Sequence, residues 1–162
     1  MAQSFEVTYE PDNAARAERA FYVRSVLELR RLSTFGPPIA FTVFVAGGLL
    51  LDAPAWFVEF FAVWLALSVL GPVFFYLARP LAAKRHARAH PRRQITLSQQ
   101  SIEISGDNGK SAHIEWSRIK HVWETSDDLL LVLGKFASIS IPKRSLPEGA
   151  GESIRASVRD AG

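Results

Sequence analysis

The dominant feature of the hydropathy pattern is an apolar stretch at residues 34–78, interrupted once by Asp52-Ala53-Pro54. Its two apolar halves are 35–51 and 55–78, and Asp52 and Glu59 are its only charged residues. A helix that spans a bilayer needs about 20 predominantly apolar residues. The pattern therefore predicts a transmembrane helical hairpin over 34–78 with a very short outer turn. The alternative is a buried helix pair, but a chain of 162 residues offers little protein to cover two helices that are apolar all round.

The region before the hairpin, 1–33, shows two shorter patterns. Residues 4–9 alternate between polar and apolar positions, which predicts a short strand with Phe5, Val7 and Tyr9 on one face. Residues 13–32 carry apolar positions at helical spacing among Arg and Glu. Such a helix can lie in the membrane interface or pack on a soluble domain. We favour the second because its basic residues do not segregate to one face.

The region after the hairpin, 79–93, is strongly basic, with no acidic residue. Arg30 and Arg31 precede the first span, whereas the turn between the spans has no Lys or Arg. Because cytoplasmic flanks carry the excess of Lys and Arg, we expect two spans with both termini in the cytoplasm. Basic side chains beside a membrane attract anionic headgroups. The candidate lipid contacts are Arg79, Lys84, Arg85, Arg88, Arg92 and Arg93.

The last region, 94–162, has the texture of a small antiparallel sheet. Short runs of alternating or continuous apolar residues predict six strands and one closing helix at 147–160. The strands are expected at 95–97, 102–104, 111–116, 119–124, 129–133 and 137–141. Strands of this length with one helix suggest a sheet that curls into a small barrel, with the helix over an open end. The expected fold class is α+β, joined to a membrane hairpin.

Candidate chemistry is sparse. The chain has no Cys, which excludes disulfides, thiolate metal sites and a cysteine nucleophile. His86 and His90 share a helix face at i, i+4, but no HExxH pattern and no acidic neighbour in the sequence accompanies them. No phosphate-loop, dinucleotide or nucleophile-elbow motif is present. We therefore expect no metal site, no cofactor and no enzymatic activity.

Residues 95–146 carry a family resemblance. They read ITLSQQSIEISGDNGKSAHIEWSRIKHVWETSDDLLLVLGKFASISIPKRSL and follow a two-helix hairpin with a basic exit. This arrangement resembles the YcxB-like bacterial membrane proteins, and more widely the membrane-attached bacterial pleckstrin-homology-like (PH-like) domains. The resemblance implies a PH-like barrel with a C-terminal helix, in the bacterial inner membrane. Such a barrel has seven strands, so residues 5–9 are a candidate for the seventh.

The sequence and the resemblance together predict a non-enzymatic membrane protein that presents a PH-like interaction or regulatory domain at the cytoplasmic face. Its expected partners are anionic lipids and either another protein or a second copy of the chain. Because the basic excess is confined to 79–93, no nucleic-acid partner is expected, and no small-molecule substrate is evident. The alternatives are an accessory subunit of a transporter and, less favoured, an enzyme at the membrane surface.

Overall fold

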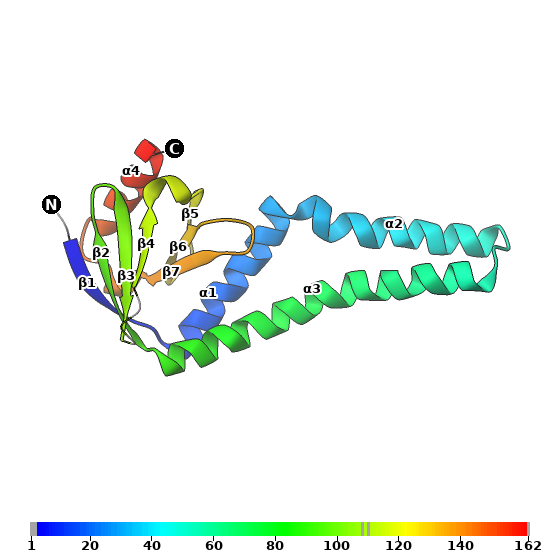
Figure 1. Ribbon diagram of the computed structural model, residues 1–162, viewed down its shortest axis with the longest axis horizontal. Helices are drawn as coiled ribbons and strands as arrows, with labels where there is room; N and C mark the ends of the chain where they lie inside the picture. Colours follow the sequence, from blue (N-terminus) through cyan, green and yellow to red (C-terminus); the bar gives the residue numbers. More distant parts are fainter. Residues whose placement is uncertain (1–2, 108, 110, 162) are drawn as a thin grey trace. The chain divides into compact units, whose positions relative to one another are not determined.

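The computed structural model describes residues 3–107, 109 and 111–161, and the chain has an α+β fold (Figure 1). It divides into two compact units. The hairpin unit is Val23–Ala78, and the sheet unit combines Met1–Tyr22 with Arg79–Gly162. The described elements include four α-helices and two antiparallel sheets, which confirms the α+β part of the predicted fold class.

The hairpin unit contains a π-helical turn, Ser25–Leu29, then α2, Arg31–Leu50, and the first part of α3, Ala55–Ala89. The chain reverses between α2 and α3 at Asp52, which has a left-handed backbone with φ of 47°. The Ala53 N–H donates to the Gly48 carbonyl at 2.9 Å, as in a Schellman helix ending. The very short turn predicted between the apolar helices is therefore confirmed.

Aromatic rings and one glycine join α2 to α3. Phe44 and Phe61 stack with ring centroids 4.7 Å apart, and Phe41 lies 6.2 Å from the same ring. A Cβ added to Gly48 would lie 3.2 Å from side-chain atoms of Phe57 and Val58. The absence of a side chain at Gly48 thus lets the helices approach closely where they meet the turn.

Both helices of the hairpin are long and apolar enough to cross a membrane. In the most apolar window of α3 no residue is buried, and in that of α2 only 11% are. Glu59 is also exposed. α2 begins earlier than the predicted span, so Pro37 and Pro38 lie inside the helix rather than in its first turn. α3 continues as a helix through most of the basic segment to Ala89.

The described residues of the sheet unit form seven strands in two antiparallel sheets. The first sheet has the order β1-β2-β3-β4, and β1 pairs with β2 in a register that places Phe5 opposite Ile95. The N-terminal residues therefore supply the seventh strand. The second sheet has the order β5-β6-β7. The strands are β1 Gln3–Thr8, β2 Arg92–Leu97, β3 Ser101–Gly106, β4 Ser111–Glu115, β5 His121–Glu124, β6 Asp128–Val132 and β7 Ser138–Pro142.

The expected small barrel is not closed. A 3-10 turn, Trp116–Arg118, separates β4 from β5, and these two strands belong to different sheets. The buried Trp116 fixes this turn, since its indole N–H donates to the Ser98 carbonyl at 3.0 Å. The sheets still share one core, to which α4, Ala150–Ala161, contributes Ile154. Other members of the core are Val7, Ile95, Ile102, Leu129, Leu131 and Ile141.

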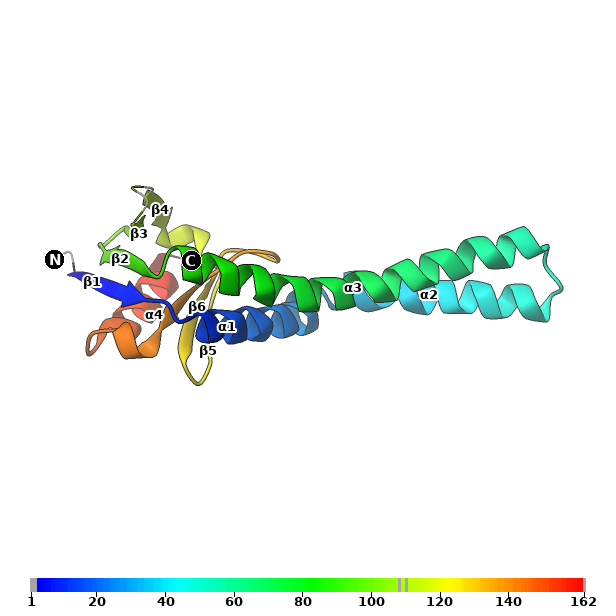
Figure 2. The same cartoon turned by 90° about the horizontal axis from the view of Figure 1, so that it is seen from below.

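Helix α1, Pro11–Arg24, covers the second face of the β5-β6-β7 sheet (Figure 2). All five residues of β6 are buried, which explains the continuous apolar run in its sequence. Leu129 and Leu131 face the shared core, whereas Phe21 of α1 packs on Trp123 with ring centroids 5.9 Å apart. Of the two roles considered for this helix, packing on the sheet is confirmed for its residues up to Tyr22.

This packing gives a stability prediction. Phe21 is fully buried, so Phe21→Ala should lower the free energy of unfolding by about 3–5 kcal/mol. The measurement is denaturant unfolding of the full chain in detergent, followed by tryptophan fluorescence. Phe136→Ala is the matched control, because the Phe136 side chain is 65% exposed and its removal should cost much less. Equal losses in the two variants would contradict the packing of α1 on the sheet.

Candidate functional site

The basic segment 79–93 connects the end of α3 to the start of β2. Residues up to Ala89 form the last turns of α3, and Arg92 and Arg93 begin β2. One face of these turns is buried at Pro80 and Ala87. The basic side chains project from the rest of the helix and from the strand. Their surroundings differ, and so do the roles that they can take.

Arg79 and Lys84 are bound to helix α1. The Arg79 guanidinium lies 2.6 Å from the Glu18 carboxylate, donates to the Phe136 carbonyl at 2.9 Å and sits 5.5 Å above the Phe21 ring. Lys84 donates to the Asp12 carboxylate at 2.6 Å. This hydrogen bond holds the pKa of Asp12 below its usual value. Both side chains therefore help to hold α1 beside the end of α3.

Arg85, Arg88 and Arg92 are exposed. Arg92 approaches Glu6 at 3.8 Å in a pair that is open to solvent, and such pairs contribute little to stability. Among the residues that the structure describes, Arg85 and Arg88 form no ion pair. Of the six basic candidates, these two are exposed and form no ion pair among the described residues, so they are open to an external anion.

Arg93 is half-buried and held by an aromatic ring. Its guanidinium lies 5.0 Å from the centroid of the Tyr9 ring. Tyr9 is itself buried, and its hydroxyl donates to the Ser140 carbonyl at 2.7 Å. Burial raises the pKa of Tyr9 to about 12, so the phenol stays protonated and neutral at physiological pH. Tyr9 thus offers Arg93 a fixed, uncharged surface to stack on.

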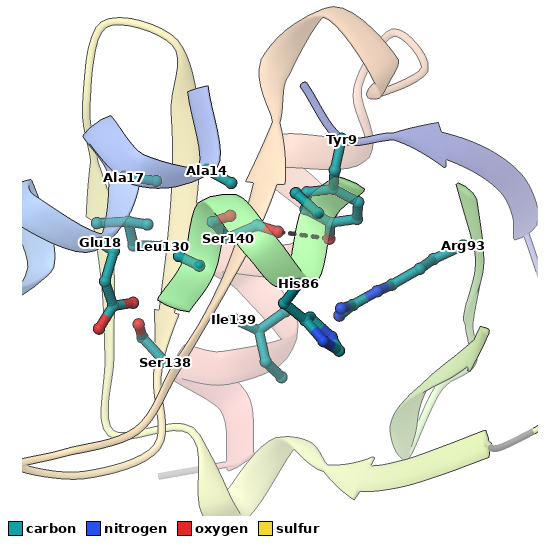
Figure 3. A pocket seen from close by; sticks show the side chains of 12 residues that line it. Tyr9, Ala14, Ala17, Glu18, His86, Arg93, Leu130, Ser138, Ile139 and Ser140 are labelled. Carbon is teal, nitrogen blue, oxygen red and sulfur yellow. Dashed lines mark hydrogen bonds between the residues drawn. The ribbon is translucent and has the colours of Figure 1, made fainter. Parts of the chain in front are cut away.

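A small cleft opens beside Arg93 (Figure 3). It has a volume of about 150 Å³ and is lined by residues of α1, the end of α3 and β7. Tyr9, Arg93 and His86 lie at one end of it, and the Arg93 guanidinium points toward the His86 ring. Glu18 lies at the other end, on α1. The cleft combines apolar walls with one permanent positive charge.

His86 lies in the last turn of α3 and His90 directly follows the helix, with the two ring centroids 5.3 Å apart. The fold adds an acidic neighbour that the local sequence does not show. Asp107 lies 2.9 Å from Nδ1 of His90, and a carboxylate can only accept, so this nitrogen carries a proton. Desolvation by neighbouring groups, together with Arg93 and His90 nearby, lowers the pKa of His86, although its side chain is exposed. In the described part of the chain, no three His, Asp or Glu side chains are placed to hold a metal ion.

The comparisons with known proteins give one match. Residues 97–156 match the family model described as YcxB-like protein. No curated protein and no solved structure matches the chain. The matched segment runs from the end of β2 into α4, and the hairpin, β1 and α1 lie outside it. The resemblance to the YcxB-like proteins is therefore confirmed for residues 97–156, the segment that the family model matches.

Proposed function

We propose that this chain is a membrane-anchored, non-enzymatic interaction protein. In this proposal the hairpin unit is inserted in the bacterial cytoplasmic membrane, and the sheet unit is a PH-like module on its cytoplasmic side. The observation that carries the proposal is the uncovered apolar surface of α2 and α3, in which almost no residue of the most apolar windows is buried.

The size of this surface favours a bilayer. Burial of one large apolar side chain is worth about 1.5–3 kcal/mol, so a helix pair with many exposed ones is strongly driven out of water. Phe60, Trp64, Leu67, Leu70 and Phe74 are among the exposed residues of α3. The helical backbone satisfies its own hydrogen bonds, as the hydrocarbon region of a membrane requires. Exposed apolar patches of this extent on a soluble monomer are rare.

The distribution of basic residues supports the proposed orientation. Arg30 and Arg31 lie at the start of α2, and the basic segment 79–93 follows the apolar part of α3. The turn between α2 and α3 has no Lys or Arg. By the positive-inside rule, both ends of the hairpin that carry Arg then face the cytoplasm.

The architecture of the sheet unit supports a PH-like module. Seven strands lie in two antiparallel sheets that share one core, and α4 packs against that core. We propose that this module binds another protein or a second copy of the chain. The exposed basic groups Arg85 and Arg88 would contact anionic headgroups of the inner leaflet.

Reporter fusions test the insertion and the orientation. We expect activity from a cytoplasm-active reporter fused after Gly162 and from a periplasm-active reporter inserted after Ala53. The exchanged pair, with each reporter at the other site, is the control and should be silent. A C-terminal fusion that is well expressed but inactive in the cytoplasm would contradict the proposed topology.

Neutralisation of the exposed bases tests the lipid contacts. Each basic group near an anionic membrane surface contributes about 1 kcal/mol, or about fivefold in lipid preference. Arg85→Gln and Arg88→Gln should each lower the ratio of bound phosphatidylglycerol to bound phosphatidylcholine by about that factor. Native mass spectrometry of the full chain in mixed micelles measures this ratio. Arg118→Gln and Lys120→Gln remove exposed bases from another part of the sheet unit and should leave the ratio unchanged.

A further inference from the structure

The end of α3 and the start of β2 also border a second cleft in the sheet unit. This second cleft, of about 200 Å³, adjoins the first and shares His86 and Arg93 with it. Its walls include His90, Ser111 and the apolar residues Ile104 and Ala112 of the β1-β2-β3-β4 sheet. Three nitrogen-bearing side chains and one hydroxyl therefore line a concave site in the sheet unit.

Arg93 is placed to bind an anion. No carboxylate of a described residue forms an ion pair with it, although the guanidinium is half-buried. Its position in β2 and its stacking on Tyr9 restrict its conformations before any ligand arrives. A guanidinium presents a planar fork of N–H donors that matches two oxygens of a phosphate group. A preorganised fork loses less conformational entropy on binding than a free surface lysine.

The nearby carboxylates do not fill the site. Asp107 accepts from Nδ1 of His90, and Glu18 is paired with Arg79 at 2.6 Å. Arg79 offsets the negative charge of Glu18, and the Asp107 carboxylate already accepts a hydrogen bond from His90. Among the described residues, Arg93 and His86 form no ion pair. The Ser111 hydroxyl is a further polar group in the lining of the cleft.

We propose that the cleft formed by Arg93, His86, His90 and Ser111 binds a phosphate group, carried by a lipid headgroup or by a soluble phosphate ester. Arg93 binds two of its oxygens, His86 and the serine hydroxyl donate to the others, and His90 can donate only when both of its ring nitrogens are protonated. This site is distinct from the exposed Arg85 and Arg88, and it does not require the hairpin to be inserted in a membrane.

Binding at this site is coupled to proton uptake. The groups that face His86 are Arg93 from β2, His90 just after the end of α3 and Asp107 from the turn after β3. Tyr9 and Glu18 line the adjoining cleft. Desolvation and Arg93 lower the pKa of His86, so the free imidazole is neutral at pH 7. A bound dianion offsets the positive charge of Arg93 and raises this pKa, so His86 takes up a proton and the anion binds more tightly as the pH falls.

Sulfate is the sharpest probe, because its charge does not change between pH 5.5 and 7.5 and only the protein titrates. Isothermal titration with sulfate should use the full chain in phosphatidylcholine nanodiscs. We expect sulfate to bind at least about fivefold more tightly at pH 5.5 than at pH 7.5. Arg93→Gln should weaken binding at least about tenfold. Arg118→Gln, which removes an exposed charge elsewhere, should change it less than twofold.

A measurement on the unmutated chain tests the proposal without relying on the correct folding of Arg93→Gln. Sulfate should shift the imidazole titration of His86 to higher pH, as followed by nuclear magnetic resonance. His113 and His121 lie outside the cleft lined by His86, His90 and Arg93 and serve as internal controls. Absence of sulfate binding, equal binding to Arg93→Gln, or equal shifts of all four histidines would overturn the proposal.

The source of the phosphate group is resolved by a change of lipid. Nanodiscs that contain phosphatidic acid, without sulfate, should shift the His86 titration selectively if a lipid headgroup occupies the cleft. If the shift appears only with a soluble ester such as glycerol phosphate, the ligand comes from solution. A cleft that responds to neither phosphate source would contradict the assignment, even if sulfate binds.

Discussion

The proposed function depends on one physical feature, the apolar surface that α2 and α3 leave uncovered. The two helices pack on each other through Phe44, Phe61 and the contact of Phe57 with Gly48, but this contact uses only one side of each helix. Almost no residue in the most apolar windows of the two helices is buried. In the proposed function a bilayer supplies the missing environment, so the membrane is the first part of that proposal.

The sheet unit follows different physical rules. Its stability comes from one shared core and from a strand, β6, that is buried on both faces. Segments that are distant in sequence complete it, because β1 pairs with β2 and α1 packs on the second sheet. The ion pair between Glu18 and Arg79 is partly shielded, with 21% and 24% of the side chains exposed, and therefore contributes more than an open surface pair. The N-terminal residues are thus part of the folded module and not a separate tail.

Local patterns predicted much of this architecture. The apolar stretch gave the hairpin and its short turn, and alternation gave the strands, including the N-terminal one. The open barrel was not predictable, because strand order across the Trp116–Arg118 turn depends on pairings that no local pattern encodes. The candidate site could not be predicted from the sequence either. Arg93 stacks on Tyr9, and Asp107 contacts His90, only once the sheet has formed. In sequence, the six basic residues of 79–93 look alike, whereas the fold gives them at least three different environments.

The most direct test of the account is cysteine accessibility, which the absence of native Cys makes straightforward. Val63→Cys places a thiol on an exposed position of α3, and Gln99→Cys places one on an exposed position of the sheet unit. In inverted membrane vesicles treated with a membrane-impermeant maleimide, we predict that Gln99→Cys is labelled and Val63→Cys is not, although both are labelled after denaturation. Labelling of Val63→Cys at the rate of Gln99→Cys in intact vesicles would contradict the central claim that α3 lies in the bilayer.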